Sequence, residues 1–133
     1  MIVVDTSVWI DYFNGRDTPE TERLDSSLGN SVVATGDLIV LEILQGFRSD
    51  KDYKTAKKYL SSLHQYNMLT PDLAIKGAEN YRKLRKKGIT IRKTADVIIA
   101  TFCIEHRLPL LYTDKDFLPF TQHLKLRSVV EKS

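Results

Sequence analysis

Four acidic residues stand in or directly beside apolar runs of this chain: Asp5, Glu42, Asp96 and Asp114. Two of them end such a run, one begins a run, and Glu42 interrupts one. Moving a carboxylate out of water is expensive unless a partner or a cation compensates it. Because these residues are spread over the whole length of the chain, we predict that the fold gathers them into one shared site.

The expected strands and helices place these acids at one edge of a sheet. Asp5 and Asp114 directly follow predicted strands, and ligands bind outside the carboxyl ends of the strands in open parallel sheets. Asp96 lies in the first turn of a predicted helix, and helices that follow strands begin at this same edge. Glu42 shares a helical face with apolar residues that should lie on the sheet. Neighbouring hydroxyls could hold ordered waters or a phosphate oxygen: Thr6, Ser7 and Thr113.

Four ionised carboxylates in one place need a cation. At about 5 Å apart, each pair would repel by roughly 3 kcal/mol at an effective dielectric constant of about 20. Oxygen ligands favour Mg²⁺ or Mn²⁺ over zinc. No zinc-like spacing relates Cys103 to the histidines, which are His64, His106 and His123. Acidic all-oxygen sites serve phosphoryl chemistry, in which divalent ions activate a water and stabilise the leaving oxygen.

Each acid also has an ordinary structural explanation. Asp96 would be favourable in the first turn of a helix because of the helix dipole, and Asp5 could cap the helix that follows it. Asp114 and Asp116 could be turn residues. Glu42 is the hardest to explain in this way, because capping does not apply in the middle of a helix.

Short apolar strands alternate with amphipathic helices along the chain, which is typical of a parallel sheet covered on both faces. We therefore expect one domain over residues 1–133, a three-layer α/β/α sandwich with a central parallel sheet. The predicted strands are 2–4, 32–35, 68–70, 110–113 and 126–130. The predicted helices are about 7–13, 19–28, 37–44, 73–87 and 95–105, the last capped by Thr94, with further helical spacing over 53–66.

Composition and charge indicate where the protein acts and on what. With 133 residues, 42% hydrophobic residues and no apolar stretch of membrane-spanning length, the chain reads as a cytoplasmic globular protein with no membrane association. Its net charge of +3 is unevenly distributed. Basic residues crowd the segment 82–93, where Arg82, Arg85, Arg92 and Lys93 could contact a polyanion such as RNA. Arg92 and Lys93, just before Asp96, are the best candidates for reaching a phosphate. The ordinary alternative is a solvated helix face followed by a loop.

The segments that contain the acids resemble a known family. The segments 5–11 (DTSVWID), 42–46 (EILQG), 96–100 (DVIIA) and 113–117 (TDKDF) together look like a PIN-domain nuclease, and more closely like the VapC-type toxins of prokaryotic toxin–antitoxin pairs. The resemblance covers nearly the whole chain. It implies an endoribonuclease that depends on Mg²⁺ or Mn²⁺, forms a homodimer, and joins a VapB-like antitoxin that inhibits it in a larger complex.

The resemblance also implies roles for individual residues. Asp5 and Asp96 would be the principal metal ligands, and Glu42 would be a ligand or would orient the attacking water. Asp114 would complete the acidic quartet, with Asp116 as its rival because some relatives carry Asn at the position of Asp114. Supporting contacts to water or phosphate would come from Thr6 and Thr113. The basic residues named above would contact RNA or an acidic antitoxin segment.

Two other classes of function compete with this interpretation. An aspartate-based phosphatase would need a second Asp two residues after Asp5, where the chain has Ser7, and a receiver domain would need an acidic pair at the first strand and a late Lys. A catalytically inactive PIN-fold module that only binds RNA would be expected to lack one of the acids. All four are present.

Overall fold

Four short parallel strands form the centre of the molecule. In the computed structural model, which describes residues 1–30 and 32–129, they are β1 (Ile2–Val4), β2 (Val33–Gly36), β3 (His64–Tyr66) and β4 (Leu110–Leu111). Their order across the sheet is β3-β2-β1-β4, so β1 lies between two neighbours. β1 pairs with β2 through Ile2 opposite Val33, and with β4 through Val3 opposite Leu110.

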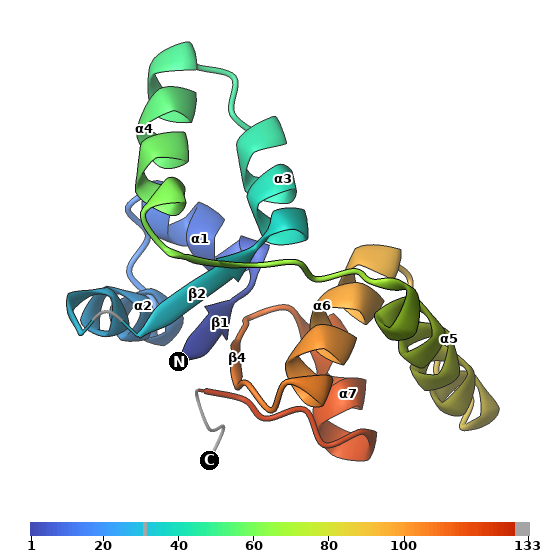
Figure 1. Ribbon diagram of the computed structural model, residues 1–133. Coiled ribbons are helices and arrows are strands. Elements are labelled where there is room, and N and C mark those ends of the chain that lie inside the picture. Colours follow the sequence, from blue (N-terminus) through green and yellow to red (C-terminus); the bar gives the residue numbers. More distant parts are fainter. Residues whose placement is uncertain (31, 130–133) are drawn as a thin grey trace.

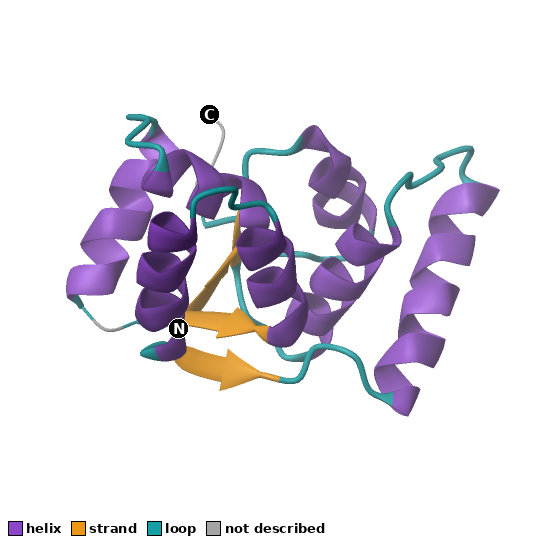
Figure 2. Cartoon of the chain, turned by 90° about the horizontal axis from the view of Figure 1, so that it is seen from above, coloured by secondary structure: helices purple, strands orange, loops and turns teal. Residues whose placement is uncertain are grey.

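The helices make up far more of the chain than the strands (Figure 2). They are α1 (Thr6–Phe13), α2 (Pro19–Gly29), α3 (Asp37–Gln45), α4 (Asp50–Ser61), α5 (Pro71–Lys86), α6 (Thr94–Glu105) and α7 (Leu118–His123), with a 3-10 turn, η1, at Lys115–Phe117. Figure 1 shows α3 and α4 together at one end of the molecule and α5 beside α6 at the other. Among the described residues, no helix has the length and apolar character needed to cross a membrane.

The direction of the chain changes beside β1. From β1 the chain steps outward to β2 and β3, and it then returns across the sheet to β4 on the other side of β1. Parallel crossovers are right-handed, so the helices of the two directions cover opposite faces of the sheet. The predicted three-layer α/β/α architecture is confirmed. Such a reversal opens a crevice at the carboxyl ends of the two diverging strands, which here are β1 and β4.

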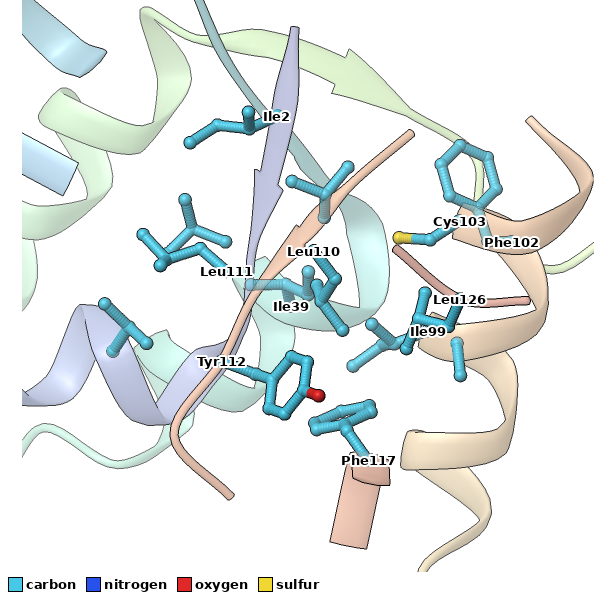
Figure 3. Packing of buried hydrophobic residues seen from close by; sticks show 14 of the residues in the cluster. Ile2, Ile39, Ile99, Phe102, Cys103, Leu110, Leu111, Tyr112, Phe117 and Leu126 are labelled. Atoms are coloured by element: carbon cyan, nitrogen blue, oxygen red, sulfur yellow. The ribbon is translucent and has the colours of Figure 1, made fainter. Parts of the chain in front are cut away.

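The core includes buried residues from most of the helices, and a large part of it lies between the sheet and α6. This helix is apolar nearly all round, and buried residues along its length include Ile99, Phe102 and Cys103. Figure 3 shows these side chains together with Leu110 of β4 and with Leu126. A helix that is apolar on every side must be covered on every side. α6 is therefore held firmly, and the residue in its first turn has a fixed position.

The structure corrects the prediction around the third strand. The strand is His64–Tyr66, not 68–70, and α4 ends at Ser61, so the helical spacing does not continue to residue 66. Met68 is buried for a different reason. Its side chain fills the space beside Gly36, and a Cβ atom at position 36 would collide with the Met68 Cγ and Sδ atoms. Its backbone N–H donates to Asp37 Oδ1 at 3.1 Å instead of to a neighbouring strand.

Three further predictions differ at their ends. Thr94 is the first residue of α6 and not its cap, because Lys93 has the extended backbone of the N-cap and no side chain caps the helix. The predicted strand 126–130 is reduced to one bridge between Leu110 and Ser128, and residue 130 lies outside the described part of the chain. The fourth strand ends at Leu111, earlier than predicted.

Candidate metal centre

Asp5 stands where β1 turns into α1. It is the N-cap of α1, and its Oδ2 atom accepts hydrogen bonds from the Ser7 backbone N–H at 3.3 Å and from the Ser7 hydroxyl at 2.7 Å. The side chain is only 5% exposed. Burial raises the pKa of this carboxyl, the bonds from Ser7 oppose that rise, and the negative charge of Glu42 adds to it. Asp5 therefore caps α1 and also lies at the edge of the sheet, so the two predicted roles are compatible.

Ser7 connects the ends of the two strands that border the crevice. Its hydroxyl oxygen lies 3.2 Å from Thr113 Oγ1, just beyond β4, as well as bonding Asp5. The hydrogen bond to Asp5 and the contact with Thr113 fix the distance between β1 and β4 at the sheet edge. The sequence places Ser7 near the acids, but nothing in it indicates this bridging contact, which depends on two strands that are far apart in the chain.

Asp96 is the buried acid of the first turn of α6. It is 6% exposed, and its Oδ2 atom has no hydrogen-bond partner among the described residues. Burial raises its pKa to about 7, and the negative charge of Asp5 adds to the rise, whereas the positive charge of Lys93 opposes it. A favourable position at the start of a helix accounts for an exposed acid. It does not account for a buried oxygen without a partner.

Asp114 and Asp116 lie close to Asp96. Each of the three carboxylates offers one oxygen atom, and these atoms all lie within 4.8 Å of one another. Asp114 also accepts the backbone N–H of Asp116 at 2.9 Å, which makes it the N-cap of η1. Both candidates for the fourth acidic position therefore face the buried acid of α6, and the geometry alone does not choose between them.

Glu42 reaches the site from α3. The Thr6 hydroxyl donates to Glu42 Oε1 at 2.8 Å, across 36 positions of sequence. Glu42 and Asp5 both lie outside the group of three carboxylates, but the charge of Glu42 acts on Asp5, and the charge of Asp5 acts on Asp96. The acids therefore form a chain of interacting charges that runs across the edge of the sheet from α3 to η1.

The basic residues fall into two groups. Arg92 lies 3.3 Å from Asp116, and Lys93 lies 3.5 Å from Asp114, both as exposed ion pairs at the border of the acidic cluster. Two negative charges raise the pKa of Lys93: that of Asp96, which has the larger effect, and that of Asp114. Arg82 and Arg85 instead line a groove of about 490 Å³ between α5 and α6, where Arg85 lies 5.6 Å from the centre of the Tyr81 ring. The structure thus brings half of the predicted basic residues to the acids.

The donor set fits a hard divalent cation. Every candidate ligand atom is a carboxylate oxygen, and Mg²⁺ and Mn²⁺ prefer such ligands. The unpartnered Oδ2 atom of Asp96 offers a lone pair that nothing else in the described structure uses. A bound cation would also offset the desolvation and mutual repulsion that raise the pKa values of Asp5 and Asp96.

Known proteins share this chain's sequence pattern and fold. The family model of the PIN domain matches residues 2–120. Ribonuclease VapC11 of Mycobacterium tuberculosis (strain ATCC 25618 / H37Rv) is 30% identical over 122 residues, which cover 88% of this chain and 89% of that protein. Among solved structures, VapBC2 from Rickettsia felis bound to a DNA fragment from their promoter superposes with a TM-score of 0.76 at 18% identity, covering 96% of this chain and 97% of the other. DNA-bound VapBC from Salmonella typhimurium gives a TM-score of 0.73 at 20% identity, with 96% and 97% of the chains covered.

Proposed function

The chain belongs to the PIN-domain family and, within it, to the VapC ribonucleases, and from this membership we propose that it hydrolyses RNA phosphodiester bonds with Mg²⁺ or Mn²⁺ held at the acidic cluster. The observation that carries the metal assignment is that Asp96 has a buried and unpartnered Oδ2 atom and that its carboxylate lies within reach of two further carboxylates. When bound, the metal supplies positive charge to the scissile phosphate and lowers the pKa of a water molecule.

The residues of the chain have separate tasks in this proposal. Asp5 and Asp96 are the principal ligands, and Asp114 completes the set with Asp116 beside it. Glu42 has one oxygen fixed by Thr6, which leaves Oε2 to accept a proton of the attacking water and orient it. Ser7 holds Asp5 in its orientation by two hydrogen bonds to one oxygen.

The cations bordering the cluster bind the substrate. Arg92 and Lys93 are exposed and lie beside the acids, so their side chains can contact the phosphates next to the cleaved linkage. The hydroxyl of Thr113 faces the same edge; because the Ser7 proton goes to Asp5, Thr113 donates to Ser7, and its oxygen can still accept a hydrogen bond from a water that contacts the phosphate. Arg82 and Arg85 lie in the groove between α5 and α6, where they would meet RNA farther along the strand or an acidic segment of a partner.

The expected partner is an antitoxin. The solved structures with this fold include a toxin–antitoxin complex from Klebsiella pneumoniae, at 21% identity and a TM-score of 0.68. We infer that this chain is likewise a toxin inhibited by a VapB-like antitoxin, that it acts as a homodimer, and that the two proteins assemble into a larger complex. The cytoplasm is the expected site of action, because the RNA substrate and the antitoxin are found there.

The test compares cleavage and metal binding in the same preparations. Wild-type protein should cut single-stranded RNA in Mn²⁺ and stop in EDTA. Asp96→Asn and Asp5→Asn should lower the rate by on the order of 100-fold or more, because the metal contributes several kcal/mol of transition-state stabilisation. Mn²⁺ should raise the Tm of the wild type but not of Asp96→Asn. Glu79→Gln, an exposed acid of α5, is the matched control and should behave as wild type.

Three outcomes would contradict the proposal. Wild-type cleavage by purified Asp5→Asn protein would remove the acidic cluster from the chemistry. A Tm shift with Mn²⁺ but no cleavage of any RNA would instead identify a binding module whose chemistry has been lost. Acid-labile phosphate on Asp5 would favour the phosphatase class.

A further inference from the structure

A second charged pocket lies at the far end of α6 from the acidic cluster. It has a volume of about 350 Å³, and it is lined by Cys103, Ile104, Arg107, Leu108, Lys125 and Arg127. Asp96 is in the first turn of α6, and Arg107 follows its last turn, so the two sites are about 16 Å apart along the helix axis at 1.5 Å per residue. The pocket is therefore separate from the candidate metal centre.

The backbone at this pocket is unusual. Arg107 has φ 54° and Lys125 has φ 67°, and they are the two residues other than glycine with positive φ in the described part of the chain. The left-handed conformation brings the Cβ atom too close to the backbone, so it costs free energy that glycine avoids. Both of these strained positions carry a cationic side chain, and both side chains line the same pocket.

Other helices of this chain use glycine for the same turn. α5 ends in a reversal in which Ile89 N–H donates to Leu84 O at 3.0 Å, and the left-handed residue there is Gly88. α1 ends in the same way, with Gly15 in that position. At the end of α6 the equivalent bond joins Leu108 N–H to Cys103 O at 2.9 Å, but the left-handed residue is Arg107. The turn itself therefore does not explain the arginine.

The charges of this pocket are not neutralised by the described structure. Within residues 1–30 and 32–129, no acidic side chain pairs with Arg107, Lys125 or Arg127, and none lines the pocket. Arg127 Nη2 donates to the carbonyl oxygen of Arg107, which fixes one side of the pocket. The carboxyl ends of α6 and α7 lie nearby and carry about half a negative charge each at most, so three full positive charges leave an excess of roughly +2.

We propose that this cationic pocket is an exosite that binds the phosphate backbone of the RNA substrate away from the cleaved linkage. The inference rests on the proposed ribonuclease function and extends it to substrate affinity. Guanidinium groups match phosphate oxygens in geometry and stack on bases. The apolar wall formed by Ile104 and Leu108 suits the face of a base or a ribose. A nucleotide has both a phosphate for the cations and a base or ribose for the apolar wall, whereas a free anion would use only the cations.

The double variant Arg107→Asn/Lys125→Asn separates this proposal from a structural role. Asn tolerates the left-handed conformation better than Arg or Lys, so the Tm should stay equal or rise. Binding of fluorescein-labelled oligouridine, measured in EDTA so that no cleavage occurs, should weaken by about tenfold or more, because two charge-assisted contacts are lost. The slope of log K against log salt should fall by about 0.7 for each phosphate contact removed from a single strand.

Controls make the outcome decisive. Lys54→Gln/Lys58→Gln removes the same charge from α4 and should keep the wild-type salt slope. With RNAs of graded length, the Asn variant should raise KM for long substrates only, and kcat should be unchanged. If it matches the wild type in affinity and slope, or weakens binding no more than the α4 control, the exosite is wrong. Polyglutamate provides a further control. If it binds this pocket but does not displace the labelled RNA, the ligand is an acidic protein and the RNA proposal is also wrong.

Failure of the exosite is distinguishable from failure of the proposed function. A protein without ribonuclease activity would cut no RNA of any length in Mn²⁺, whatever the variant. The binding measurement in EDTA does not depend on cleavage. Lys125→Gly alone serves as a second variant, because no described residue pairs with its side chain and glycine suits its backbone. It should show about half the change in salt slope.

Discussion

The Thr6 hydroxyl donates to Glu42 Oε1 over 2.8 Å, and this bond joins the first turn of α1 to the middle of α3. Thr6 follows Asp5 directly. One short segment of chain therefore contains a principal acid and also orients the side chain of a second acid, Glu42. Glu42 would otherwise have a flexible side chain at the edge of the site. In the proposed mechanism this hydrogen bond holds the side chain through Oε1 and leaves Oε2 free to orient the attacking water.

Thr6→Val should therefore lower kcat by about tenfold while KM changes little. The change removes one hydrogen bond of about 1 kcal/mol and frees Glu42 to adopt other rotamers, but it keeps the β-branched shape of the side chain. Steady-state cleavage of a fluorogenic RNA would measure the effect. Thr6→Ser keeps the hydroxyl and should retain most of the activity. Equal kcat for the Val variant and the wild type would show that Glu42 does not act through this bond.

The raised pKa of Asp96 predicts that stability falls as pH rises. Its carboxyl has a pKa of about 7 in the folded protein and about 3.9 in an unfolded chain. Between these values the folded state holds more protons, so the stabilisation is fully present below about pH 4 and is lost as pH rises through 7. The slope is at most about 1.4 kcal/mol per pH unit from this group. Asp5, whose pKa is also raised, acts in the same direction.

Urea unfolding in EDTA between pH 5 and 8 would measure this slope. Asp96→Asn should flatten it, because the amide does not titrate, whereas Glu79→Gln should leave it unchanged. Added Mn²⁺ should have the opposite pH dependence, since a carboxylate must lose its proton to bind the metal. Stability that rises with pH in the wild type without metal would contradict the assignment of a desolvated, protonated Asp96.

How much of the site could be predicted from sequence depends on the range of the interaction. Asp5 and Asp96 were identifiable because a carboxylate beside an apolar run is visible in a few neighbouring residues. The contacts of Thr6 with Glu42 and of Ser7 with Thr113 join residues far apart in the chain, so no local pattern indicates them. The structure places all the predicted acids at one edge of the sheet, and their roles remain proposals.

The fold shows the same division between local and distant causes. The strand at Ile2–Val4 and most of the helices were predicted nearly to their ends, but the helical spacing over 53–66 belongs to a helix at Asp50–Ser61. The third strand was not predicted correctly, because His64–Tyr66 is a largely exposed edge strand with little apolar signal. Met68 has a stronger signal, but its burial comes from the space beside Gly36 and not from strand pairing. A rule that equates apolar runs with strands selects the wrong segment here.

The rivalry between Asp114 and Asp116 can be settled by comparing their Asn variants. Both Asp116 oxygens face Arg92, at 3.3 and 3.4 Å, so this carboxylate shares its charge with a guanidinium. Asp114 lies three residues beyond the end of β4 and uses one oxygen to cap η1. We expect Asp114→Asn to lower cleavage and Mn²⁺ affinity at least about tenfold more than Asp116→Asn. Asn also caps well, so the fold should survive. The reverse order would make Asp116 the fourth acid.

Lys93 has two effects of opposite sign, and Lys93→Gln should show both. Its ammonium group lies 3.5 Å from Asp114 and is attracted to Asp96, so its removal leaves the cluster more negative. Mn²⁺ affinity should rise by roughly three- to tenfold at low salt, less at physiological salt, because exposed charges are screened. RNA binding should weaken, and its salt slope should fall by about 0.7 if Lys93 contacts one phosphate. Calorimetric titration with Mn²⁺ and anisotropy with labelled RNA measure the two effects separately. Lys76→Gln on α5 is the control and should change neither affinity. If Lys93→Gln instead lost metal binding and RNA binding together, Lys93 would support the structure of the site and would not bind phosphate.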